Sequence, residues 1–125
     1  MNSLSDPLMH CPRKVCDLEA ALARMGANVR LVREMLDLFR EDEPIYLSRL
    51  HDSLAAGDAA GVKHAAHSLR GMLSVFGAES AMHVAQRLED LAGGGELSGA
   101  AELESEFGRE VARFLEVTST ELAGL

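Results

Sequence analysis

Several features that narrow the class of a protein are scarce or missing in this sequence. Its 125 residues include no tryptophan, one tyrosine and two cysteines. Two cysteines cannot supply the dense disulfide framework of a small secreted domain. No apolar run approaches the roughly 20 residues that span a bilayer, and the N-terminus lacks the basic and then apolar stretches of a secretory signal. We therefore expect a cytoplasmic protein with no membrane insertion.

Positive charge is scarce as well. Twelve lysines and arginines stand against twenty aspartates and glutamates, which gives a net charge of −8. Nucleic acids and anionic membranes attract basic surfaces, so neither is expected as the main partner. The length suits one domain with a single core, and we expect a monomer.

Signals for nucleotide binding are also missing. The run Gly93-Gly94-Gly95 is not followed by Gly-Lys-Ser/Thr, and no glycine-rich strand–loop–helix pattern is present. We therefore expect the chain not to be an enzyme that takes phosphate from ATP.

Alanine, leucine and glutamate are abundant, and this composition favours packed helices. Apolar residues recur at spacings of three and four, and capping residues and glycines mark the ends of the segments. The predicted helices cover 17–26, 28–57, 58–76, 78–92 and 98–122. Because the connections are short, the four long helices should form an all-α, antiparallel up-and-down four-helix bundle, with a short extra N-terminal helix.

Prolines punctuate this pattern. Two of them lie in residues 1–15, which show no sustained periodicity and are predicted to form an N-terminal arm, partly disordered; the domain proper covers 16–125. Pro44 lies inside the second predicted helix, where it removes a backbone donor and clashes with an earlier carbonyl, so a kink is expected over 40–44. The acidic run 41–43 is interpreted as a solvated face.

The stretch 67–78 carries the chemistry. Wound as a helix at roughly 100° per residue, the segment 62–76 gathers its apolar residues on one face: Val62, Ala66, Leu69, Leu73 and Phe76. His67 lies about 140° from the centre of that face, so its imidazole should be exposed. A neutral imidazole is a competent nucleophile near neutral pH.

Cations flank this histidine. Lys63 and Arg70 lie about one turn before and after His67, where either side chain could hold an oxyanion or a phosphoryl group brought to the ring. Gly71 costs the helix roughly 1 kcal/mol relative to alanine, which we explain by a partner that needs the space. The other predicted partner-binding residues are His64, Met72 and Ser74.

A carboxylate on the following helix is predicted to orient the histidine. Counted outward from a turn at 77–78, His67 and Glu89 lie at nearly the same level of two antiparallel helices. Glu89 could accept a hydrogen bond from Nδ1 of His67 and so leave Nε2 free to attack. The alternative is an ordinary surface glutamate, paired with Arg87 or with a solvent cation.

The histidines and cysteines also raise the question of a metal site. His64 and His67 form a His-x-x-His pair that can chelate from one helix face, and His10, Cys11 and Cys16 are close in sequence. A di-iron bundle needs Glu-x-x-His repeated on two helices, and that repeat is absent. No metal site is predicted, and a surface histidine without function is the alternative for His67.

The motif His-x-Leu-Arg-Gly at 67–71, followed by Gly-Ala at 77–78, resembles the signature of the histidine phosphotransfer (HPt) domains of bacterial two-component phosphorelays. Shorter pieces over 17–122 resemble the same family in the same order. Arg70 stands where that family usually has lysine, which keeps the charge and changes the donor geometry. Met72 is bulky where the family commonly has a small residue.

The resemblance implies a function. His67 would accept a phosphoryl group from the aspartate of a response-regulator receiver domain, downstream of a hybrid sensor kinase, and pass it to another receiver aspartate. Arg70 would stabilise the transferred charge. Mg²⁺ would come with the receiver, so no intrinsic cofactor is expected. The alternative is a non-catalytic helical module that binds a receiver or another signalling protein without phosphotransfer.

Overall fold

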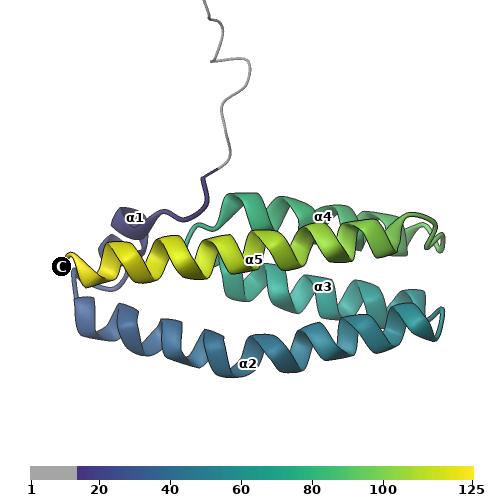
Figure 1. Ribbon diagram of the computed structural model, residues 1–125, viewed down its shortest axis with the longest axis horizontal. Coiled ribbons are helices and arrows are strands. Elements are labelled where there is room, and N and C mark those ends of the chain that lie inside the picture. The colour runs from purple at the N-terminus through teal and green to yellow at the C-terminus, as the bar shows by residue number, and fades with distance from the viewer. Residues whose placement is uncertain (1–13) are drawn as a thin grey trace, which may run out of the picture.

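The computed structural model describes residues 14–125, so the predicted arm over 1–15 lies almost wholly outside the described residues. This part of the chain forms helices and no strand. The helices are α1 (Leu18–Arg24), α2 (Val29–Ala55), α3 (Ala59–Ser74), α4 (Glu79–Gly93) and α5 (Ala100–Ala123). Figure 1 shows α2 to α5 side by side in a bundle, with α1 at one end. The predicted all-α bundle is confirmed, and none of these helices is apolar enough over a sufficient length to span a membrane.

The first three helices begin at the predicted capping residues. The side chains of Asp17, Asn28 and Asp58 each accept a hydrogen bond from the backbone N–H three residues later, at 3.1, 3.0 and 3.0 Å. Each bond satisfies a donor that the first turn of a helix leaves without a partner. The starts of α1, α2 and α3 are therefore fixed by local sequence.

Four predicted helix boundaries are wrong by two residues. α1 ends at Arg24 rather than at residue 26, and α2 ends at Ala55 rather than at residue 57. α3 ends at Ser74, two residues before the predicted Phe76, because the chain there turns to meet the N-terminal segment. α5 begins at Ala100, two residues after the predicted Ser98. Glu96 accepts hydrogen bonds from both N and Oγ of Ser98 at 3.0 Å, and these bonds keep Ser98 in the preceding turn.

The N-terminal segment closes the end of the α3–α4 hairpin. The N–H of Asp17 donates to the carbonyl of Phe76 at 2.8 Å, and Arg24 Nη1 donates to the carbonyl of Ser74 at 3.0 Å. Gly77 has a φ of +60°, and a Cβ at this position would come within 2.7 Å of Asp17 Cβ, so the turn requires glycine. The fixed turn sets the level at which α3 faces α4.

One face of α3 is buried in the core. The apolar residues predicted to be buried over 62–76 are all at most 2% exposed: Val62, Ala66, Leu69, Leu73 and Phe76. The rings of Phe39, Phe76 and Phe114 pack together, with centroids 5.4 to 6.2 Å apart. The outer face of α3 is thereby left to carry His67.

α2 runs as one helix through Pro44, and Figure 1 shows it bending near its middle. A proline inside a helix is a common cause of such a bend. The interpretation of 41–43 as a solvated face is wrong for Glu43, which lies on the core-facing side of α2 and is 9% exposed. Burial raises the pKa of its carboxyl, and no described residue forms a hydrogen bond or ion pair with it.

Candidate functional site

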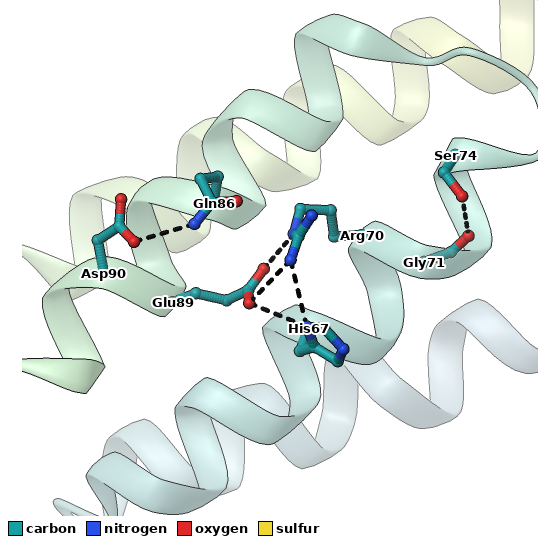
Figure 2. A network of polar contacts seen from close by, with 7 residues as sticks. All are labelled: His67, Arg70, Gly71, Ser74, Gln86, Glu89 and Asp90. Carbon is teal, nitrogen blue, oxygen red and sulfur yellow. Dashed lines mark hydrogen bonds and ion pairs between the residues drawn. The ribbon is translucent and has the colours of Figure 1, made fainter.

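His67 lies on the outer face of α3, and its side chain is 67% exposed. Figure 2 shows its ring beside the side chains of Arg70, from the next turn of α3, and Glu89, from α4. One ring nitrogen faces the glutamate and the other points away from it. The exposure predicted from the helical pattern is present.

Glu89 contacts His67 at the level that the hairpin count predicts. Its Oε1 lies 3.0 Å from Nδ1 of His67, and its side chain is only 8% exposed. The alternative of a surface glutamate paired with Arg87 is wrong, because Arg87 faces α5 and contacts Glu106 at 3.4 Å. A hydrogen bond from Nδ1 to this carboxylate keeps the proton off Nε2.

Arg70 completes a three-residue network rather than standing free beside the histidine. Its Nε donates to Oε2 of Glu89, and its Nη2 lies 3.2 Å from Oε1 of the same carboxylate. The same Nη2 lies 3.2 Å from Nδ1 of His67. The sequence indicated a cation near the ring but not this pairing with Glu89.

The ion pair between Arg70 and Glu89 changes the pKa of both residues. Burial is the largest influence on the pKa of Glu89 and raises it. The hydrogen bonds and charge interactions with Arg70 and His67 together outweigh burial, so the pKa lies below its usual value. The bond to Glu89 raises the pKa of Arg70. The site thus holds a buried carboxylate in its ionised form beside an exposed imidazole.

Lys63 and His64 lie one turn before His67. With Ala60, they and His67 line an open hollow on α3. The ammonium of Lys63 reaches toward the end of α4, where it lies 3.9 Å from the place a Cβ would take at Gly93. Within the described residues Lys63 forms no hydrogen bond with the network around His67, so the structure does not join it to Arg70.

Gly71 and Ser74 lie on the exposed surface next to the network. A Cβ placed on Gly71 would meet nothing within 4 Å, so no contact inside the molecule excludes a side chain there. The hydroxyl of Ser74 donates to the carbonyl of Gly71 at 2.6 Å, as Figure 2 shows. The glycine leaves the surface beside His67 open.

An apolar groove lies between α2 and the C-terminal end of α3. It has a volume of about 190 Å³ and is lined by Met35, Leu38, Phe39, Asp42, Met72, Val75 and Phe76. Leu38 is 51% exposed, as is Ile45 seven residues later. Of the groove residues, only Met72 is among the predicted partner-binding residues. The missed signal was an apolar stripe on α2 outside its core face, with Leu31, Leu38 and Ile45 spaced by seven.

No group of three or more His, Cys, Asp or Glu side chains suited to a metal ion occurs among residues 14–125. His10 and Cys11 lie outside the described residues, and Cys16 contacts Glu121 at the α1 end of the bundle, with Sγ 3.6 Å from Oε1.

Comparison with known proteins gives a consistent picture. A model of the family described as the Hpt domain matches residues 34–117, a span that contains the whole network. The chain is similar to histidine-containing phosphotransfer protein B of Pseudomonas aeruginosa PAO1: the TM-score is 0.81, the identity is 29%, and the match covers 91% of this chain and 99% of that chain. No curated protein matches. Because the family model covers more than half of its length, the chain belongs to the Hpt domain family of histidine phosphotransfer proteins.

Proposed function

We propose that this Hpt domain carries its phosphoryl group on Nε2 of His67. Proteins of the family are phosphoryl carriers in two-component phosphorelays rather than classical enzymes, and this chain is such a relay intermediate. The observation that carries the assignment to His67 is the 3.0 Å contact of its Nδ1 with the buried Glu89. That contact favours the tautomer whose lone pair lies on the exposed nitrogen.

The chemistry needs little from the chain beyond this arrangement. The lone pair of Nε2 attacks the phosphorus of a receiver aspartyl phosphate, the N–P bond forms, and the P–O bond to the aspartate breaks. The electron pair stays on the aspartate carboxylate, and the proton of Nδ1 stays between the ring and Glu89. The charge of Glu89 stabilises the imidazolium that results. Transfer to the next receiver is the same step in reverse.

The partner completes the site. We assign Mg²⁺ to the receiver domain and the use of ATP to an upstream hybrid kinase, because phosphoryl transfer depends on metal and positioning that a free carrier need not hold. The receiver would dock on the apolar groove between α2 and α3, with Gly71 leaving room beside His67. A monomeric, cytoplasmic carrier fits this scheme.

A transfer assay tests the proposal. A receiver domain labelled with radioactive phosphate is mixed with this protein and Mg²⁺, and the label should move to an acid-labile adduct that mass spectrometry places on His67. Tight binding of the receiver with no transfer would instead support the non-catalytic interaction module. Label on a residue other than His67 would overturn the assignment of the acceptor.

A further inference from the structure

The guanidinium of Arg70 contacts both the carboxylate of Glu89 and Nδ1 of His67. These two groups decide which ring nitrogen of His67 carries the proton. Its Nη2 lies 3.2 Å from Oε1 of Glu89 and 3.2 Å from Nδ1 of His67, while Nδ1 itself lies 3.0 Å from that same Oε1. Its Nε holds the second carboxylate oxygen. Figure 2 shows the three side chains closing a small network, from which Nε2 points away.

The two contacts of Nδ1 require different tautomers. A neutral imidazole carries its proton on one ring nitrogen only. If Nδ1 carries the proton, it donates to Glu89 and Nε2 keeps its lone pair. If Nδ1 accepts a hydrogen bond from Arg70, the proton lies on Nε2, and that nitrogen has no lone pair in the ring plane with which to attack phosphorus.

Arg70 weakens the hydrogen bond from Nδ1 to Glu89, and it can itself donate a hydrogen bond to Nδ1. A carboxylate that is neutralised by a guanidinium is a weaker acceptor for the ring N–H than a carboxylate alone. The cation also lies beside Nδ1, where it favours a lone pair over a proton. While Arg70 stays in this position, part of the population should therefore hold its proton on Nε2.

We propose that Arg70 is a positioning residue that couples the tautomer of His67 to the arrival of a phosphoryl group, an inference that rests on the proposed function. In the free protein Arg70 holds Glu89 and keeps part of His67 in the unreactive tautomer. The anionic oxygens of an incoming phosphoryl group attract the guanidinium away from the carboxylate. The proton then moves to Nδ1, which donates a hydrogen bond to Glu89, and the lone pair appears on Nε2.

The proton balance is simple. The ring of His67 is 67% exposed, so water can take the proton from Nε2 and supply one to Nδ1. Transfer then proceeds as above: the N–P bond forms, the P–O bond to the receiver aspartate breaks, and the electron pair remains on that aspartate. No proton has to leave Nε2 during the step itself.

The tautomer can be measured directly from the ¹⁵N chemical shifts of the ring nitrogens in the labelled full chain, near neutral pH. Replacing Arg70 by alanine should raise the ratio of Nδ1–H to Nε2–H at His67 roughly fivefold, the equilibrium change of one ordinary hydrogen bond. Arg70→Lys should raise it less, because one ammonium cannot hold both carboxylate oxygens as a guanidinium does. The ring of His51, which contacts Glu104 at 2.9 Å, is the internal control and should not change.

An unchanged ratio at His67 in both variants would overturn the inference, provided that circular dichroism shows both to be folded. The proposed function is tested apart from this, by transfer from a phosphorylated receiver to the unmodified protein. Transfer to His67 with an unchanged ratio would reject only the role of Arg70. Absence of transfer to His67 would reject the proposed function, and this inference with it.

Discussion

Two histidine–glutamate pairs on this bundle look almost alike, and only one of them lies in the site. His67 of α3 contacts Glu89 of α4 at 3.0 Å, and His51 of α2 contacts Glu104 of α5 at 2.9 Å, in both cases through Nδ1. The two imidazoles are 67% and 69% exposed. Contact geometry and exposure of the ring therefore do not distinguish the proposed phosphoryl acceptor from an ordinary surface pair.

The difference lies in what surrounds each carboxylate. Glu89 is 8% exposed and is held by Arg70, whereas Glu104 is 24% exposed, and the structure gives it no arginine partner among the described residues. A hydrogen bond to a buried, ionised carboxylate is strong because water competes poorly for it, while an exposed ion pair contributes little. A buried carboxylate such as Glu89 can therefore fix the orientation of an exposed imidazole, whereas a more exposed one such as Glu104 holds it weakly.

The largest expected effect comes from removing each imidazole in turn. His67→Gln should abolish acceptance of phosphate from a receiver, because glutamine has no ring nitrogen that could attack phosphorus in place of Nε2. His51→Gln is the matched control and should leave transfer at the level of the unmodified protein. Radiolabel transfer measured on both variants decides the point. Full transfer to the His67→Gln protein would mean that His67 is not the acceptor.

The next largest effect should come from replacing the two glutamates that contact these histidines. Glu89→Gln keeps the size of the side chain but removes the charge that favours a proton on Nδ1, so the rate of transfer should fall roughly tenfold to a hundredfold, as for other partners that orient a reactive histidine. Glu104→Gln should change the rate by less than about twofold, as expected for an exposed pair. Rapid-quench kinetics measure both. Equal losses in the two variants would show that burial of the carboxylate is not the deciding difference.

A third effect concerns the surface around the site rather than the ring. Leu38→Glu places a charge in the apolar groove beside α3 and should weaken receiver binding about tenfold, since one lost apolar contact costs roughly 1.5 kcal/mol. The side chain is 51% exposed, so the fold should tolerate the change. Phosphorylation by phosphoramidate, which needs no docking, should be unaffected. Leu125→Glu, at a side chain 62% exposed near the C-terminus, is the control in calorimetric binding measurements.

The parts of this picture that sequence could predict are those fixed by local chemistry or by counting. Asp17, Asn28 and Asp58 were identifiable as caps because short polar side chains before an apolar pattern satisfy the first N–H groups of a helix. The contact between His67 and Glu89 follows from a short turn between two regular helices, since each residue advances the chain by a constant rise. Neither prediction needs knowledge of packing.

The remainder depends on side chains that meet across the fold. Arg70 could extend to solvent or fold back on Glu89, and its helical position alone does not choose between these rotamers. The groove is lined by residues of α2 and by residues at and just after the end of α3, so neither segment defines it alone. Glu43 was misjudged because its acidic neighbours suggest a solvated run, whereas the phase of α2 turns this one side chain inward. These features come from tertiary packing.

The smallest expected effect sets Glu43 against Glu89. Both carboxylates are buried, but only Glu89 is paired with a cation, Arg70, so the pKa of Glu89 is lowered while burial raises that of Glu43. Ionised Glu43 therefore costs stability above its folded pKa, and this cost disappears as the pH falls below the ordinary value of 4.5. Glu43→Gln should raise the free energy of unfolding by about 1 kcal/mol near neutral pH.

Urea titrations at neutral and acidic pH measure this difference. The gain of the Glu43→Gln variant should vanish at about pH 3.5, where the glutamate is protonated in both the folded and the unfolded chain. Glu89→Gln should behave in the opposite way, because ionised Glu89 stabilises the fold above pH 4.5 and this contribution is lost as the pH falls through its lowered pKa. If both substitutions lowered the free energy of unfolding equally at neutral pH, pairing with Arg70 would not be what makes Glu89 differ from Glu43.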